Sequence, residues 1–230
     1  AGYNVGLMTT VAYGVNDNIT PQTEHMTTVS APLLQQRLAE FRRRNVQWVV
    51  LEVTSHALAQ HRIFGIPIDI AVMTNVTHEH LDYHKTFARY RTAKIRLFKL
   101  ARRVGIINAD DPSAAVFEQA VPRSLCYGIA GGDIRATNIT QTASGSRYDV
   151  WLMGQMHHIT INMPGEFNIA NSLAAVAVGH EVGLSRVQIE QGLAALTGVD
   201  GRMTVVDAGQ PFSAIVDFAH TPDAFERLLG

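Results

Sequence analysis

Short apolar runs alternate with helical stretches through the first half of the chain. The runs Val46–Val53 and Ile68–Met73 are continuous and rich in β-branched residues. Such runs are typical of strands that are buried on both faces of a sheet. The other elements expected here are a helix within 33–44, a longer helix at 86–101, strands at Val104–Ile107 and Leu125–Tyr127, and a short helix opened by Asp110-Asp111-Pro112. This order of strands and helices predicts a parallel α/β sheet.

The pattern changes after Gly128. Residues 133–163 form short segments of alternating apolar and polar residues, separated by Gly and Ser, which predict an antiparallel flank. Helices are expected at Gly165–Val182 and Ser185–Leu196, and a further strand and helix at Ile215–Asp217 and Thr221–Leu229. The sequence therefore predicts an α/β protein with a mostly parallel sheet over residues 1–128 and an antiparallel β flank with helices to about residue 200.

Composition narrows the class of protein. Apolar residues make up 47% of the 230 residues and charged residues 17%, which is enough to bury a sizeable core. The formal net charge of −1 gives no electrostatic reason to expect nucleic acid or an anionic membrane as a partner. The sequence has no apolar run of the roughly 20 residues that span a bilayer and no signal segment, so we expect a cytoplasmic protein. The single cysteine, Cys126, excludes an internal disulfide bond.

Glu52 stands at the carboxyl end of the first apolar run, within Glu52-Val53-Thr54-Ser55-His56. Open α/β sheets bind their ligands at this end of their strands. The alternative interpretation is an acidic residue that caps the next helix.

A second polar stretch, Thr77–His84, follows the strand end marked by Thr74-Asn75. It contains three histidines and two acidic residues, which is more than an ordinary loop requires, although a solvated loop remains the alternative. A zinc signature of the form His-x-His-x-Asp-His is a further alternative, but the last histidine, His84, comes one residue too late for it.

Lys94 lies on the predicted helix at the same face as Phe87, Tyr90, Leu97 and Ala101. Burial of an ammonium group is costly unless the group is paired or chemically changed. The side chain therefore either extends its charged end to solvent or is carbamylated, which would make it an anion able to lie beside a divalent cation.

A third polar group occurs at the amino end of the Ala-rich helix, in Gly165–Asn171, where backbone and amide groups suit contact with a ligand. Caps formed by Asn168 or Ser172 are the alternative. Two more stretches, Gly201-Arg202-Met203 and Val216–Ala224, would each be read as ordinary loops if taken singly.

Together these stretches resemble the Mur ligases, and within that family the branch of tripeptide synthetases. The resemblance rests on runs that follow the family order over residues 27–226: EVTSHALAQHR, TNVTHEHLDYH, YRTAK, INADDP, PGEFNIANSLAA, GRM and VDFAHTPDA. It implies a mononucleotide-binding sheet truncated at both ends. Residues 1–203 would be the central ATP-binding domain without its phosphate-binding loop, strand and helix, and residues 204–230 the start of the carboxy-terminal domain.

The resemblance also implies roles for single residues. The metal ligands for Mg²⁺ would be Glu52, His80 and carbamylated Lys94. The UDP-muramoyl-peptide would be held by Thr27, Thr28, Thr54, Gln60 and Arg62. ATP would be bound by Asn75, by Asn171 at the adenine, by Arg202 at the phosphates and by Asp217 at the ribose. We expect Glu52, Asn75, His80 and Lys94 to converge on one cleft.

The activity implied is ATP-dependent ligation in peptidoglycan synthesis. The substrates would be UDP-MurNAc-L-Ala-D-Glu and a third amino acid, which is diaminopimelate, lysine or ornithine, joined through an acyl phosphate. We expect the fragment alone to be inactive. The alternatives are a non-catalytic domain that binds a nucleotide sugar, and a folylpolyglutamate or cyanophycin synthetase. The sequence departs from the family at Thr54, where Ser is usual, at Glu79, where Asp is usual, and after Thr27-Thr28, where proline is common.

Overall fold

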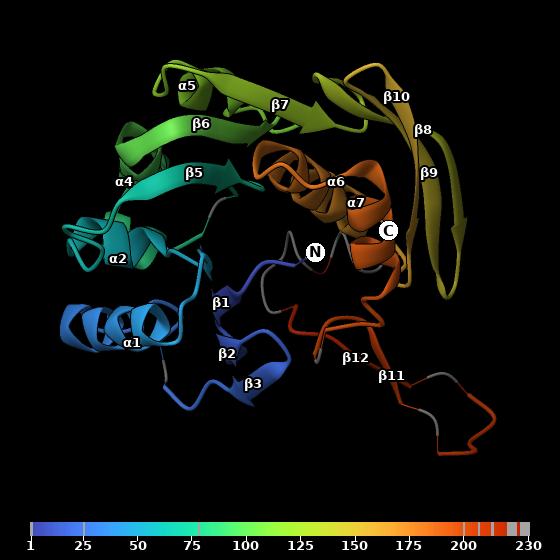
Figure 1. The fold of residues 1–230 in the computed structure, drawn as a ribbon, viewed down its shortest axis with the longest axis horizontal. Coiled ribbons are helices and arrows are strands. Elements are labelled where there is room, and N and C mark those ends of the chain that lie inside the picture. Colours follow the sequence, from blue (N-terminus) through green and yellow to red (C-terminus); the bar gives the residue numbers. More distant parts are fainter. Residues whose placement is uncertain are drawn as a thin grey trace. The chain divides into compact units, whose positions relative to one another are not determined.

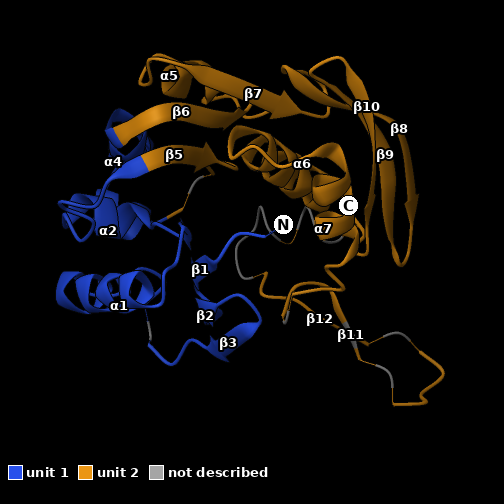
Figure 2. Cartoon of the chain, viewed as in Figure 1, with its two compact units in different colours: residues 1–68, 80–100 blue, residues 69–79, 101–230 orange. Residues whose placement is uncertain are grey.

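The structure of the chain, a computed structural model, describes residues 2–24, 26–77, 79–199, 201–206, 208–212, 214–219 and 225. The chain divides into two compact units, which Figure 2 shows in different colours. Unit 1 comprises Ala1–Ile68 and His80–Leu100, and unit 2 comprises Asp69–Glu79 and Ala101–Gly230.

Unit 1 contains a four-stranded sheet with the strand order β3-β2-β1-β4. Strand β1 pairs antiparallel with β2 and parallel with β4, and β2 pairs antiparallel with β3 (Figure 1). The strands are β1 (Val5–Met8), β2 (Ala12–Val15), β3 (Asn18–Pro21) and β4 (Trp48–Leu51). Of these strands, only β4 was predicted from the sequence, because β1 to β3 have four residues each and no clear alternation of apolar and polar residues.

The helices of unit 1 are α1 (Ala31–Arg43), α2 (Ser55–Ala59), α3 (Leu81–His84) and α4 (Phe87–Leu100). Its core joins strands β1 and β2 to helices α1 and α2, through Met8, Val15, Val29, Leu34, Phe41, Leu58 and Ile63. Gly6 permits this packing, since a Cβ atom at this position would lie 2.5 Å from the ring of Phe41. No real Cβ contact is that short, so only glycine fits without displacement of the ring.

The prediction that Val46–Val53 forms a strand buried on both faces is wrong. The strand is shorter, and the side chains of Val49 and Val50 are 37% and 52% exposed. In the described part of the chain β4 pairs with β1 alone and is the last strand of its sheet. A continuous apolar run does not reveal whether a strand is central or at an edge.

Unit 2 contains a six-stranded sheet with the order β10-β9-β8-β7-β6-β5. Strand β7 pairs parallel with β6 and β8, whereas β9 pairs antiparallel with β8 and β10. The expected parallel sheet with an antiparallel flank is therefore confirmed for the strands from β5 onward. Its expected extent over residues 1–128 is wrong, because β1 to β4 form the separate sheet of unit 1, in which two of the three pairings are antiparallel. The bounds are β5 (Ile68–Met73), β6 (Ala101–Asn108), β7 (Ser124–Gly128), β8 (Ile134–Thr142), β9 (Gly145–Leu152) and β10 (Gln155–Ile161).

The helices α5 (Ala114–Glu118), α6 (Glu166–Glu181) and α7 (Arg186–Ala194) accompany this sheet. Helix α6 packs on β6, β7 and β8, and α7 packs on β10 (Figure 1). The largest core of the unit lies between them and includes Val104, Tyr127, Ile134, Val150, Ile159, Ile169, Leu173, Val176 and Ile189. Ser185 begins α7 with a capping box, in which its hydroxyl group accepts a hydrogen bond from the amide of Gln188.

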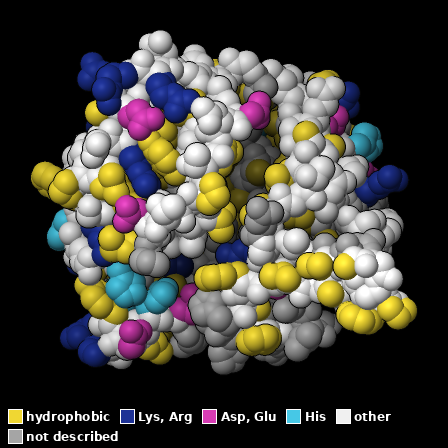
Figure 3. All heavy atoms as spheres, turned by 90° about the horizontal axis from the view of Figure 1, so that it is seen from below, with side chains coloured by type: hydrophobic (Ala, Val, Ile, Leu, Met, Phe, Trp, Pro, Cys, Tyr) yellow, Lys and Arg dark blue, Asp and Glu magenta, His cyan; other side chains and the backbone are white. Residues whose placement is uncertain are grey.

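The last described segment is an antiparallel ribbon of β11 (Thr204–Val206) and β12 (Ala214–Val216). Strand β12 begins one residue before the predicted strand, and β11 was not predicted. The predicted helix Thr221–Leu229 lies outside the described residues except for Phe225. Exposed apolar side chains gather along the ribbon, as Figure 3 shows for one face, and include Val206, Phe212, Ile215, Val216 and Phe218. In the described part of the chain no helix is long and apolar enough to cross a bilayer.

His157 on β10 gives unit 2 an expected sensitivity to acid. Its side chain is 5% exposed, and its Nδ1 atom is buried without a hydrogen-bond partner in the structure. Burial is the largest influence on His157 and lowers its pKa. The nearby Glu190 raises the pKa, whereas Arg186, His180 and His158 lower it by smaller amounts, so that the pKa lies below its ordinary value. The unfolded chain therefore binds a proton more readily than the folded chain.

We expect the free energy of unfolding to fall as the pH drops below about 6.5, the ordinary histidine pKa. His157→Leu should flatten this fall, whereas the exposed control His61→Asn should keep it. Urea unfolding at several pH values between 7.5 and 5 measures both. Equal pH dependence in His157→Leu and in the unsubstituted chain would contradict the assignment.

Candidate functional site

Glu52 lies directly after β4, where its carboxylate contacts the loop after β1. Its Oε2 atom accepts hydrogen bonds from the backbone amide of Thr10 at 2.8 Å and from the Thr10 hydroxyl group at 3.0 Å. Thr54, not Glu52, caps the following helix, since its hydroxyl group accepts from the amide of Ala57. The capping interpretation of Glu52 is therefore excluded, and its exposed carboxylate is held in one orientation.

Thr28 connects the segment before α1 to both sides of this strand end. Its hydroxyl group donates to the carbonyl of Glu52 at 2.9 Å and accepts from the amide of Thr54 at 3.0 Å. The side chain is 1% exposed. Thr28 therefore fixes the backbone, and its hydroxyl group is fully used within the protein.

The other expected substrate residues surround this point. The hydroxyl oxygens of Thr10 and the half-buried Thr27 lie 2.9 Å apart; because the Thr10 proton is donated to Glu52, the Thr27 hydroxyl group is the donor in this contact. Arg62 donates to the carbonyl of Thr28 at 2.6 Å and, through two nitrogen atoms, to the Oε1 atom of Gln60. The structure thus brings Glu52 and the five expected substrate residues into one hydrogen-bonded network within unit 1, with Gln60 exposed at its border.

A cluster of histidine and tyrosine rings adjoins this network. The ring of His56 lies 4.9 Å from that of His80 and 4.3 Å from that of Tyr83, measured between centroids. Gln60 links the two groups, because its amide donates to the hydroxyl group of Tyr83 at 3.4 Å. Figure 3 shows histidine side chains gathered in a patch on one face of the molecule.

His80 occupies an unusual backbone conformation at the start of α3. Its φ and ψ angles of 57° and 29° lie in the left-handed region, which is uncommon for residues other than glycine. Residues in such conformations cluster at functional sites. The exposed imidazole of His80 contacts the rings of His56 and Tyr90.

The neighbouring histidines are poor proton acceptors. Burial lowers the pKa of His56, and repulsion by His80 lowers it further. Burial likewise lowers the pKa of His84, whose Nε2 atom lies 3.0 Å from the hydroxyl oxygen of Ser55. Both rings are therefore neutral near pH 7, which limits the positive charge around His80.

Lys94 is half-buried on α4, as its position among apolar residues predicted. Its Nζ atom lies 5.0 Å from the ring centroid of Tyr90, which also contacts His80 and His84. Tyr90 is 1% exposed and connects the lysine to the histidine cluster. Glu52, His80 and Lys94 therefore all belong to unit 1 and to its linked polar groups.

These side chains are compatible with Mg²⁺ rather than with a protein-enclosed metal site. No group of three or more His, Cys, Asp or Glu residues in the described part of the chain could hold a metal ion. Mg²⁺ retains several water molecules and is commonly bound by one or two carboxylates together with phosphate groups. The oriented carboxylate of Glu52 meets this requirement. A zinc site with three protein ligands is not offered by the described residues, and His78 lies outside them.

Asn75 lies in unit 2, in the exposed segment after β5. The backbone is fixed on both sides of it. Asn108 donates to the carbonyl of Thr74 at 2.8 Å, and the Oδ2 atom of Asp111 accepts from the amide of Val76 at 2.7 Å. Asn75 belongs to a different unit from Glu52, so the expected convergence of these residues stays a prediction.

The remaining expected nucleotide ligands also lie in unit 2. Asn171 is exposed on α6, while Ser172 beside it is buried and bonded to Tyr148. The half-buried carboxylate of Asp217 accepts from the amides of Met203 and Ala219, at 2.9 and 2.8 Å. Asp217 thereby holds the segment that carries the exposed Arg202.

Several residues of these networks received no role from the sequence. Thr10 orients Glu52, Tyr90 contacts Lys94, and Asn108 and Asp111 fix the segment of Asn75. The run INADDP was noted as a family motif, but the hydrogen bonds of its side chains could not be read from it. Thr10 carried no signal, because the strand before it was not predicted.

Comparison with known proteins gives consistent results. Residues 2–179 match the model of the Mur ligase middle domain. The chain is 38% identical over 99% of its length to a UDP-N-acetylmuramyl-tripeptide synthetase of Roseiflexus sp.. It is 36% identical over its whole length to UDP-N-acetylmuramoyl-L-alanyl-D-glutamate–2,6-diaminopimelate ligase 1 of Clostridium acetobutylicum. In both cases it covers 48% of the relative, so the chain spans about half the length of these curated relatives.

Solved structures agree with the sequence relatives. The structure of a UDP-N-acetylmuramoyl-L-alanyl-D-glutamate–2,6-diaminopimelate ligase superposes with a TM-score of 0.83 at 29% identity, covering 98% of this chain and 47% of that one. The family match includes the hydrogen-bonded network and the histidine cluster of unit 1, and most of unit 2. The chain belongs to the Mur ligase family and contains its middle domain.

Proposed function

We propose that the chain is the middle part of an ATP-dependent ligase that adds the third amino acid to UDP-MurNAc-L-Ala-D-Glu in peptidoglycan synthesis. The proposal is supported by the activities for which its relatives are named, since they include a diaminopimelate ligase and a tripeptide synthetase. The observation that carries it is the linked set of polar groups in unit 1, in which the carboxylate of Glu52 is oriented beside the expected substrate residues. Diaminopimelate, lysine and ornithine remain the candidate third amino acids.

In the proposed reaction an oxygen of the substrate carboxylate attacks the γ-phosphorus of ATP, and ADP leaves. The amine of the third amino acid then attacks the acyl carbon of the acyl phosphate, loses a proton, and phosphate leaves as the amide bond forms. Magnesium would supply charge neutralisation on the transferring phosphoryl group. Glu52, His80 and a carbamylated Lys94 are the proposed ligands.

The residues of this chain would then have distinct tasks. Thr27, Gln60 and Arg62 would contact the muramoyl peptide at the border of the hydrogen-bonded network, and Thr28 and Thr54 would hold the backbone beneath it. Asn75, Asn171, Arg202 and Asp217 would bind the nucleotide. The neutral His56 and His84 would keep repulsion low around the bound cations.

Substitution of Lys94, the residue proposed to be carbamylated, is the sharpest test of this proposal. Carbamate formation consumes a neutral amine, and arginine cannot undergo it although it keeps the positive charge. Lys94→Arg in the full-length protein should reduce amino-acid-dependent phosphate release by at least about 100-fold, which corresponds to roughly 2.7 kcal/mol of transition-state stabilisation. Lys99 is an exposed lysine on the last turn of the same helix, and Lys99→Arg is the matched control that should retain activity. Wild-type turnover in Lys94→Arg would show that the lysine is structural.

Thr10 should act through Glu52, as a positioning residue. Thr10→Val removes the hydroxyl donor to the carboxylate, and a hydrogen bond to a charged group is worth about 1.5–3 kcal/mol. In the full-length enzyme the magnesium concentration for half-maximal rate should therefore rise by roughly tenfold or more. Thr10→Ser should restore the wild-type magnesium dependence, and Thr20→Val on the exposed strand β3 should not alter it. A drop in rate without a change in magnesium dependence would exclude the proposed action.

A further inference from the structure

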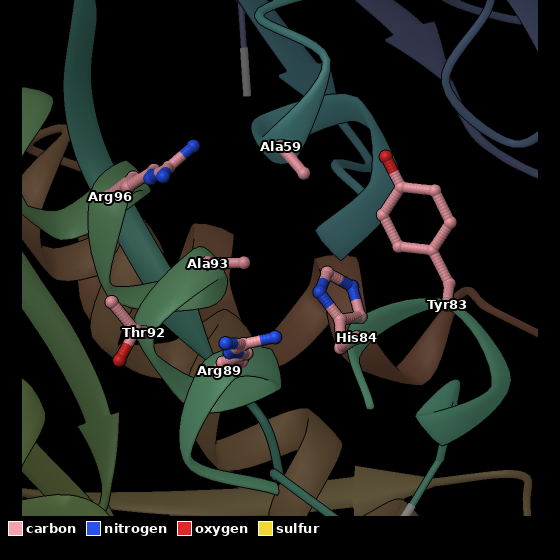
Figure 4. A pocket seen from close by; sticks show the side chains of 7 residues that line it. All are labelled: Ala59, Tyr83, His84, Arg89, Thr92, Ala93 and Arg96. Carbon is pink, nitrogen blue, oxygen red and sulfur yellow. The ribbon is translucent and has the colours of Figure 1, made fainter. Parts of the chain in front are cut away.

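A cavity of unit 1 lies beside the histidine cluster. It has a volume of about 320 Å³ and is lined by Ala59 of α2, by Tyr83 and His84 of α3, and by the α4 residues Arg89, Thr92, Ala93 and Arg96. Figure 4 shows these side chains around the opening. Its volume is at the lower end of the range for small-molecule sites. We call it the arginine pocket.

The arginine pocket faces away from the flank of α4 that carries Lys94. A helix turns by about 100° per residue, so Arg89 and Arg96 lie roughly 140° and 160° around the helix axis from Lys94. Glu52, His80 and Lys94 do not line the pocket, although His84 belongs both to its lining and to the histidine cluster. The pocket is therefore distinct from the side chains proposed to bind magnesium.

The arginine pocket carries uncompensated positive charge. Its lining contains two arginines and no acidic side chain. In the part of the chain that the structure describes, neither Arg89 nor Arg96 forms an ion pair. Of their two guanidinium groups, only that of Arg96 donates a hydrogen bond among the described residues, a long one of 3.5 Å to the carbonyl of Leu58. The two residues are seven positions apart, or about 10 Å along the helix axis. Their long side chains can reach one group between them from opposite sides.

Neutral groups add further hydrogen-bonding capacity. The Tyr83 hydroxyl oxygen accepts from Gln60, which leaves its own proton available. The buried ring of His84 uses Nε2 towards Ser55, and among the described residues its Nδ1 atom has no partner. When the Ser55 hydroxyl group donates to Nε2, the Nδ1 atom of His84 carries the proton and has the capacity to donate a hydrogen bond.

We propose that the arginine pocket binds a phosphate group, either as inorganic phosphate or as the phosphate of a small ester. Two guanidinium groups and a tyrosine hydroxyl group offer more donors than the two oxygens of a carboxylate can use, whereas the oxygens of a phosphate can accept them all. Arginine is preferred at such sites because its planar fork matches phosphate geometry. This proposal does not depend on the proposed ligase activity.

The test is a titration of the ¹⁵N-labelled 230-residue chain with sodium phosphate at constant ionic strength, followed by amide chemical shifts. We expect saturable shifts in α3 and α4, and a weakening of binding by at least tenfold in the double variant Arg89→Ala/Arg96→Ala. Arg42→Ala/Arg43→Ala removes an exposed pair from α1 and is the matched control, which should bind like the unsubstituted chain. Unchanged affinity in the pocket variant, or equal loss in the control, overturns the proposal.

Three further arms define the ligand and the site. Arg89→Lys/Arg96→Lys keeps both charges and should still weaken binding, since lysine lacks the fork; unaltered binding would indicate a diffuse charge effect and contradict the proposal. Lys94→Ala should bind phosphate normally, and loss of binding there would assign the phosphate to the proposed nucleotide site instead. Succinate should bind at least tenfold more weakly than phosphate, and equal binding would overturn the phosphate assignment. Glycerol 3-phosphate, compared with inorganic phosphate, distinguishes an ester from the free ion.

Discussion

The buried hydroxyl group of Thr28 joins three parts of unit 1 that are distant in the sequence. It bridges the carbonyl of Glu52 and the amide of Thr54, and the carbonyl of Thr28 accepts from Arg62. Separation of buried hydrogen-bonded groups costs about 1–3 kcal/mol for each group left unsatisfied. The end of β4, the start of α2 and the segment before α1 are therefore fixed together, and Thr28 holds the backbone from which the side chains of Glu52 and Thr54 extend.

The same packing that forms unit 1 also sets the charge of its polar surface. Tyr90 is buried in the core, yet its ring contacts Lys94, His80 and His84. Burial keeps His56 and His84 neutral near pH 7 by lowering the pKa of each. These two rings therefore add no positive charge beside His80, where magnesium is proposed to bind. The arginine pocket lies on the other flank of α4 and has the opposite character, with two arginines and no acidic side chain in its lining.

Unit 2 shows how exposed side chains can be given a fixed position. Asn108 and Asp111 hold the backbone before and after Asn75, and Asp217 holds the segment of Arg202 through the amide of Met203. In each case the side chain with the expected role is exposed, while its backbone is bonded to a neighbouring loop. Such support reduces the reorganisation that a ligand would require. The supporting residues are as important to these sites as the ones expected to touch the nucleotide.

The sequence alone determined the elements whose pattern is long or strongly apolar, such as β5, α4 and α6, and the family to which the chain belongs. These features depend on local periodicity and on continuous runs of residues. Only the tertiary structure decided that Thr54 rather than Glu52 caps α2, that Val49 and Val50 are exposed, and that Thr10 orients Glu52. Those outcomes depend on strand pairing and on hydrogen bonds between residues as many as 42 positions apart, for which the chain carries no local signal.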